Sequence, residues 1–228
     1  MVWGCASLGG EITAVEPTQS AGLDLKIHDP VSQVPPAESG LQSARNDSAR
    51  VRLYPLHNTD AAETSEMLAR SADFHRDWVT YPTSLDQVAA FIARSADDGM
   101  LILGIRRPSD NILVGIVTLC RIAREPWLTA ECGAAVDVRH RGKGYMAEGM
   151  RLLVRFAIDE LGLHRVEALV RPENVRSAHM LTSAGFRIEG IARGAVRIQD
   201  SWVDHVRWAI TAEDLAIIRR DALVEERG

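Results

Sequence analysis

A short basic segment with two glycines is the part of this sequence best suited to chemistry. Its basic residues are Arg139, Arg141 and Lys143, and its glycines are Gly142 and Gly144. An amphipathic helix is expected to begin directly afterwards. The first turn of a helix leaves backbone N–H groups without intrahelical partners, and the helix dipole adds partial positive charge. Glycines leave those N–H groups uncrowded by side chains, so an anion can approach them. The segment therefore predicts a phosphate-binding loop.

The spacing separates this loop from two other phosphate-binding loops. A P-loop has four residues between its first glycine and a Gly-Lys-Ser or Gly-Lys-Thr sequence. Here Gly142-Lys143 is followed by Gly144 and then by Tyr145, so the P-loop pattern does not fit. A Rossmann loop needs a third glycine that in this chain comes two positions late, at Gly149. The pattern that remains is Arg-x-x-Gly-x-Gly, beginning at Arg139.

The elements around the loop decide how it is presented. The apolar stretch 132–138 predicts a strand before it, and the helical spacing of apolar residues predicts a helix after it, ending at Gly162. A strand at 165–171 and a helix at 175–184, capped by Asn174, follow. Further strands are expected at 51–56, 100–106, 112–120, 188–198 and 202–210, and helices at 60–69, 84–93 and 215–224. This order predicts a mixed α/β sheet with helices on both faces.

Composition narrows the class of protein. The 228 residues are 46% hydrophobic and 25% charged, which is typical of a soluble globular domain. A net charge of -5 speaks against general nucleic-acid binding and favours amine-bearing partners. No apolar stretch is long enough to cross a bilayer, so we expect no membrane association and a cytoplasmic location. The three cysteines have no zinc-site spacing, and no metal is expected.

The sequence also suggests where the folded domain begins. We expect residues 1–49 to form a poorly ordered extension and residues 50–228 to form the folded domain with its C-terminal helix.

Several motifs in this order resemble one family. The Arg-x-x-Gly-x-Gly loop and the predicted element order are similar to those of the GNAT superfamily of acetyl-CoA-dependent N-acetyltransferases. Four later segments resemble its RimJ/RimL type, which acetylates ribosomal proteins: Glu160–Ala168, Asn174-x-x-Ser177, Ala184–Gly190 and Trp202-x-Asp204-His205. The resemblance implies the GNAT fold, in which the central sheet is splayed between the strand before the loop and the strand after its helix.

The resemblance also implies where acetyl-CoA would bind. Its pantetheine arm would lie in the gap between the splayed strands, pairing with backbone groups of Val136 and Val138, and a backbone N–H near Val136 would contact the oxyanion. The phosphates would lie against the loop. The implied coenzyme-binding residues are Val136, Val138, Arg139, Arg141, Gly142, Lys143, Gly144, Tyr145 and Asn174.

The catalytic residues are less sharply indicated. Many family members place a Tyr where this chain has Leu181, whereas RimJ/RimL-like members carry a Ser at the position of Ser177. Ser177 is therefore the candidate partner of the leaving thiolate. Glu131 is the first candidate general base, followed by Asp204 and His205. The base that RimL-like enzymes carry after Gly-Phe has no counterpart, because Val196 stands there.

Phe74, Trp78 and Tyr81 are candidate walls of an acceptor pocket, with His205 as a further substrate contact. The function implied is direct transfer of acetyl from acetyl-CoA to a primary amine, foremost the α-amino group of a protein or peptide. Two alternatives stay open: an acetyltransferase of small amines such as antibiotics, and a non-catalytic acyl-CoA-binding module. The resemblance is also compatible with a homodimer.

Overall fold

The computed structural model describes residues 49–96, 99–198 and 200–225. The extension expected at residues 1–49 lies outside the described residues, apart from its last position. Seven strands form one sheet in the order β1-β2-β3-β4-β5-β7-β6, in which only β4 and β5 run parallel. The strands are β1 (Arg52–Pro55), β2 (Leu101–Arg106), β3 (Leu113–Ala123), β4 (Thr129–Val136), β5 (Arg165–Val170), β6 (Arg187–Ile198) and β7 (Ser201–Thr211).

Helices cover both faces of this sheet, as the sequence predicted. They are α2 (Ala61–His75), α3 (Leu85–Ala93), α4 (Tyr145–Arg155), α5 (Val175–Ser183) and α6 (Ala212–Glu225). Short 3₁₀ turns span Asn58–Asp60, Arg94–Ala96 and Val138–His140, and a π-helical turn, Phe156–Glu160, continues α4. No helix within the described ranges is long and apolar enough to span a bilayer.

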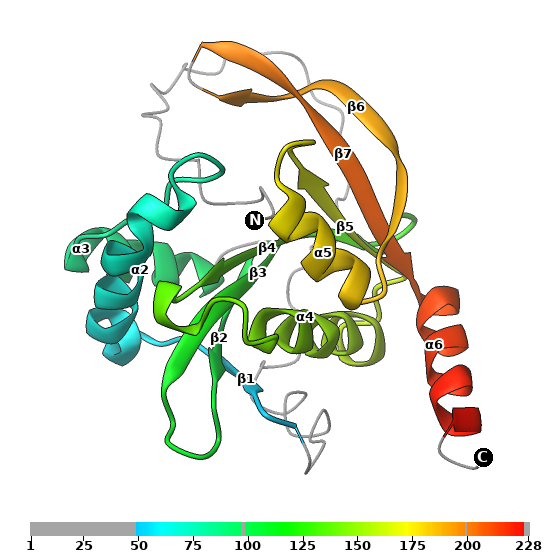
Figure 1. Ribbon diagram of the computed structural model, residues 1–228, viewed down its shortest axis with the longest axis horizontal. Coiled ribbons are helices and arrows are strands. Elements are labelled where there is room, and N and C mark those ends of the chain that lie inside the picture. The colour runs from blue at the N-terminus through cyan, green and yellow to red at the C-terminus, as the bar shows by residue number, and fades with distance from the viewer. Residues whose placement is uncertain (1–48, 97–98, 199, 226–228) are drawn as a thin grey trace, which may run out of the picture.

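Two apolar clusters divide the core, because alternate side chains of a strand point to opposite faces. On one face Ile102 and Ile116 pack with α2 and α3, whose Met67, Leu68 and Phe91 are buried. On the other face, the strands pack against α4, α5 and α6. The buried members of this second cluster include Leu103, Val117, Met150, Leu153, Phe156, Leu181 and Leu215. Figure 1 shows α4 and α5 side by side on this face.

Local signals fix several helix ends. The hydroxyl of Ser84 accepts a hydrogen bond from the Gln87 N–H at 3.4 Å at the start of α3. The Asn174 side chain accepts one from the Ser177 N–H at 3.2 Å at the start of α5. Gly162, with a φ of 65°, follows the π-helical turn, and Gly185, with a φ of 95°, follows α5. These starts and stops agree with the sequence prediction.

Three local predictions were wrong. Helix α2 continues to His75, beyond the predicted end at residue 69, because buried side chains recur along its whole length. Strand β4 ends at Val136, so Val138 lies in a 3₁₀ turn and not on the strand. Arg155 and Asp159 are four residues apart in the sequence, a spacing that predicts an ion pair on a helix surface. The Asp159 carboxylate instead accepts a hydrogen bond from Nη1 of Arg219 on α6 at 3.1 Å.

The splayed sheet is present. Strands β4 and β5 pair only at Thr129–Arg165, Ala130–Val166 and Glu131–Glu167. Beyond Glu131, β4 stays on β3 up to the Gly115–Val136 pair, while β5 stays on β7 up to the Val170–Val206 pair. The two halves of the sheet therefore separate at Glu131, and a V-shaped gap opens toward the loop after β4 (Figure 1).

Candidate active site

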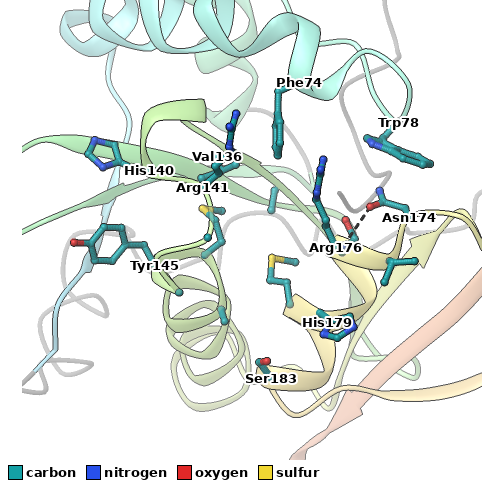
Figure 2. A pocket seen from close by; sticks show the side chains of 18 residues that line it. Phe74, Trp78, Val136, His140, Arg141, Tyr145, Asn174, Arg176, His179 and Ser183 are labelled. Carbon is teal, nitrogen blue, oxygen red and sulfur yellow. Dashed lines mark hydrogen bonds between the residues drawn. The ribbon is translucent and has the colours of Figure 1, made fainter.

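A cavity of about 630 Å³ occupies this gap and extends between α4 and α5. Figure 2 shows it with α2 above, the loop after β4 on one side and α5 on the other. It is lined by Phe74, Trp78, Ala134, Val136, His140, Arg141, Gly142, Gly144, Tyr145, Met146, Ala147, Asn174, Val175, Arg176, Ser177, His179, Met180 and Ser183. One space thus joins the end of β4, the glycine loop and the capped start of α5.

The end of β4 lines the cavity, and the backbone groups of Val136 are turned away from β3. The N–H of Asp137 donates to the Val114 carbonyl at 2.9 Å, so the N–H and C=O of Val136 point away from β3 and toward the gap. The Val136 carbonyl accepts a hydrogen bond from Nε2 of His75 at 2.9 Å. Because His75 is 2% exposed, burial lowers its pKa to about 4 and keeps the ring neutral near pH 7. The Val136 N–H is left facing the cavity.

The glycine loop has the backbone shape of an anion cradle. Gly142 and Gly144 have φ values of 74° and 80°, in the left-handed region that favours glycine. A Cβ added at Gly142 would meet no atom within 4 Å, so the loop is open on its cavity side. Helix α4 begins at Tyr145, and its first-turn N–H groups have no intrahelical acceptors. The hydrogen-bond donors and the positive potential of this loop suit a phosphate.

Arg139 and Lys143 do not line the cavity. Arg139 donates from Nη2 and Nε to the buried carboxylate of Asp137 at 2.7–3.2 Å, and Arg70 of α2 donates to the same carboxylate at 3.1 Å. Although burial raises the pKa of Asp137, these bonds lower it to about 2. The Lys143 Nζ lies 3.4 Å from Nδ1 of His140. Arg139 is thus bound to Asp137, so the structure does not support the predicted phosphate contact for its side chain.

The N–H of Val138, which was expected to pair with the coenzyme, has a partner within the protein. That group donates to the Ser71 hydroxyl at 3.0 Å, and the Val138 carbonyl accepts from the Arg141 N–H at 3.5 Å. Val138 is not part of the cavity lining. The reason is the early end of β4 at Val136, two residues before Val138. The chain turns toward α2 there, so the Val138 N–H meets Ser71 and not the gap.

Asn174 and Ser177 come together at the opposite wall. Both are 3% exposed, and both line the cavity. The Asn174 side chain is committed in part to the Ser177 N–H, as an N-cap. The Ser177 hydroxyl forms no hydrogen bond with other described residues, which leaves it available to a ligand. Leu181, also on α5, is fully buried and lies outside the lining.

Phe74 and Trp78 lie at the end of the cavity nearest α2 (Figure 2). The guanidinium of Arg171 lies 5.5 Å from the centre of the Trp78 ring. Tyr81 was expected beside them, but it is 7% exposed and packs edge-on against Phe91 in the α2–α3 core. The structure therefore brings two of the three predicted aromatic residues to the cavity.

The predicted bases lie elsewhere. Glu131 sits at the last pair before the strands separate, and its carboxylate accepts a hydrogen bond from Arg121 at 2.7 Å. His205 is fully buried on β7, opposite Ala192 of β6, and its Nδ1 lies 3.0 Å from the Val203 carbonyl. Burial lowers the pKa of His205. Neither residue lines the cavity.

Several lining residues were missed from the sequence. Arg176, His179, Met180 and Ser183 recur at helical spacing along the α5 face that meets α4. That spacing was visible in the sequence and could have identified them. His140, by contrast, gave no signal: it is 9% exposed, packs near the Tyr145 ring and has its pKa lowered by burial and by the charge of Lys143.

Known proteins share this architecture. Residues 50–187 match the family model described as acetyltransferase (GNAT) domain. The chain belongs to the GNAT family. The GNAT chain is 38% identical to the probable N-acetyltransferase YjcK of Bacillus subtilis (strain 168), over 72% of its own length and 95% of the relative's. It is 24% identical to the [ribosomal protein uS5]-alanine N-acetyltransferase of Escherichia coli (strain K12), over 77% and 95%.

Among solved structures, Mycobacterium smegmatis RimJ in complex with CoA-disulfide has a TM-score of 0.67 and 27% identity. The match covers 72% of this chain and 83% of RimJ. The fold expected from the sequence is thereby confirmed, and the protein is a RimJ-like N-acetyltransferase of the GNAT family.

Proposed function

We propose that this protein transfers acetyl from acetyl-CoA directly to a primary amine, and that the amine is the α-amino group of a protein or peptide. The observation that carries the proposal is the single cavity that joins three things: the Val136 N–H on the open edge of β4, the loop at Gly142, and the Ser177 hydroxyl on α5. Each has a separate task in acyl transfer from a phosphate-bearing thioester.

The coenzyme's phosphates are assigned to the loop after β4. Gly142, Gly144 and the free N–H groups at the start of α4 supply hydrogen bonds and positive potential without a Cβ in the way. From there the pantetheine arm would run along the open edge of β4. The thioester would then lie between Val136, at the end of β4, and Ser177, on α5, both of which line the cavity.

The transfer step needs no covalent intermediate on the protein. The amine nitrogen attacks the thioester carbon, the carbonyl oxygen gains negative charge, and the C–S bond then breaks to release the thiolate. The Val136 N–H can donate to the developing oxyanion. The amine gives up one proton and the sulfur gains one, and the Ser177 hydroxyl is placed to hydrogen-bond the sulfur as its charge develops.

The choice of acceptor rests on relatives and on the cavity. The E. coli relative is named for alanine acetylation of a ribosomal protein, and the match covers 95% of it. Trp78, at the end of the cavity nearest α2, offers an aromatic wall that could hold the first side chain of a peptide. We therefore rank an amino-terminal peptide above a small amine.

The test is acetyl-CoA turnover, followed as free-thiol release, with amino-terminal peptides beginning with Ala, Ser or Met and with small amines such as spermidine. The proposal expects release that depends on the peptide and requires its free α-amine. An N-terminally blocked version of the best peptide is the matched control and should give only background release. Turnover confined to small amines would contradict the peptide assignment, and binding of acetyl-CoA without release on any amine would contradict catalysis.

A further inference from the structure

Two arginines approach one aromatic ring from opposite sides of the cavity. The guanidinium carbon of Arg141, in the loop, lies 5.9 Å from the centre of the Phe74 ring, and that of Arg176, on α5, lies 5.2 Å from the same centre. All three residues line the cavity. Figure 2 shows both side chains directed toward Phe74, one from each wall.

Neither guanidinium is neutralised within the described part of the chain. No carboxylate there forms an ion pair with Arg141 or Arg176, whereas Arg139, two residues away from Arg141, is bound to Asp137. Both Arg141 and Arg176 are exposed residues, so the cavity mouth carries two like charges held near one ring. Like charges brought together are unfavourable unless an anion joins them. The Phe74 ring attracts both cations but has no net charge to cancel theirs.

The position of the pair points to the kind of anion. Arg141 directly precedes Gly142, where the open backbone cradle begins, and Arg176 lies one residue before Ser177. A ligand that contacts both the loop and α5 must pass between the two arginines. Guanidinium groups suit phosphate because their planar N–H fork can donate two hydrogen bonds to it.

We propose that Arg141, Phe74 and Arg176 form a clamp that binds a phosphate of the acyl donor from both walls of the cavity. This deepens the proposed function and rests on it. In the clamp the loop wall and α5 are tied together through the phosphate, and Phe74 holds the two guanidiniums in place beforehand. Arg176 is thereby a donor-binding residue on α5, outside the Arg-x-x-Gly-x-Gly loop.

The clamp is tested by titrating acetyl-CoA into the wild-type chain and into Arg141→Ala, Arg176→Ala, Arg176→Lys and the double Ala variant. Arg193→Ala is the matched control, since Arg193 is exposed on β6 and lies outside the cavity. Each clamp Ala variant should weaken binding by about tenfold, because a charge-assisted hydrogen bond is lost. Arg176→Lys should recover part of the loss, and Arg193→Ala should bind like wild type.

Two shortened donors identify the phosphate. Dephospho-CoA lacks the 3′-phosphate, and S-acetylpantetheine lacks all phosphates of the nucleotide part. If the clamp binds the 3′-phosphate, Arg176→Ala should not weaken dephospho-CoA binding. If it binds the pyrophosphate, the effect should persist with dephospho-CoA and disappear with S-acetylpantetheine. In either case the double variant should lose less than the product of the single losses, because both arginines serve one group.

Three results would overturn the clamp while leaving the proposed function intact: acetyl-CoA affinity unchanged in both single Ala variants, an equal loss for S-acetylpantetheine, or a loss confined to the KM of an acidic acceptor peptide. Failure of the wild-type chain itself to bind acetyl-CoA would instead contradict the proposed function.

Discussion

Arg50 and Glu148 are joined at two points. The Arg50 backbone N–H donates to Oε1 of Glu148 at 2.7 Å, and its Nε donates to Oε2 at 3.0 Å. Arg50 also donates from Nη1 to the Lys143 carbonyl at 3.2 Å, and its guanidinium lies 5.4 Å from the centre of the Tyr145 ring. A residue before β1 thus ties the glycine loop to the first turn of α4. The Glu148 side chain is 15% exposed in this contact.

Removing this tie should weaken donor binding more than it weakens the fold. In Arg50→Ala the loop loses its contact at Lys143, so we expect the Kd for acetyl-CoA to rise by about two- to fivefold, as for a partly exposed ion pair. Calorimetric titration measures it. Arg52→Ala, an exposed position two residues on, is the control. An equal effect in both variants would show that only net charge matters.

Ser177→Ala should separate binding from chemistry. The hydroxyl is proposed to meet the sulfur only as charge develops on it, so kcat should fall by about 10- to 100-fold while the Kd for acetyl-CoA stays within about twofold. Thr182→Ala, exposed on the same helix and outside the cavity, should match wild type. A parallel loss of kcat and affinity in Ser177→Ala would assign the residue to binding instead.

His75 should make the fold sensitive to mild acid. Because burial lowers its folded pKa to about 4, the unfolded chain takes up a proton first as the pH falls below about 6.5. Stability is therefore lost between about pH 6.5 and 4, and the loss from pH 7 to 5 should be on the order of 2 kcal/mol.

Urea unfolding at pH 7 and pH 5 measures this loss. His75→Gln keeps a donor for the Val136 carbonyl but cannot be protonated, so its stability should change less between the two pH values. Identical changes in wild type and His75→Gln would assign the acid sensitivity to other groups.

Gly115 packs where β3 approaches the cavity wall. A Cβ there would lie 2.6 Å from the Ala135 carbonyl oxygen and 2.7 Å from the sulfur of Met146. Gly115→Ala should therefore lower the free energy of unfolding by about 1–3 kcal/mol, because the backbone oxygen cannot move aside alone.

Gly149→Ala is the comparison for this prediction. The atoms nearest its Cβ would all belong to the Ile105 side chain, whereas at Gly115 the nearest atom is a backbone oxygen, and Ala is favoured over Gly within a helix. Denaturant midpoints should thus fall further for Gly115→Ala than for Gly149→Ala. The reverse order would show that the contact at Ala135 relaxes easily.

The features that the sequence predicted correctly are those that depend on neighbouring residues. The glycines of the loop, the Asn174 cap and the amphipathic face of α4 are all encoded within a few residues, and the family resemblance supplied the splayed sheet. The sequence could not show that the Asp137 carboxylate binds the Arg139 side chain, because the buried position of that carboxylate depends on Arg70 from α2. The burial of His205 likewise depends on packing between distant segments. Arg176 is a different case, because its helical spacing with His179 and Met180 is visible in the sequence and indicates a shared face of α5.

The most direct measurement of the central claim compares two glycines with the same backbone. Gly142 and Gly162 have φ values of 74° and 65°, and a Cβ on either would meet no atom within 4 Å. Glu at either position brings the same strain and charge, but only Gly142→Glu puts the carboxylate at the loop. Titration of acetyl-CoA should show binding weakened by at least about tenfold in Gly142→Glu, through repulsion of the phosphates, and retained in Gly162→Glu. Equal affinity in the two variants would contradict the placement of the acyl donor at this loop.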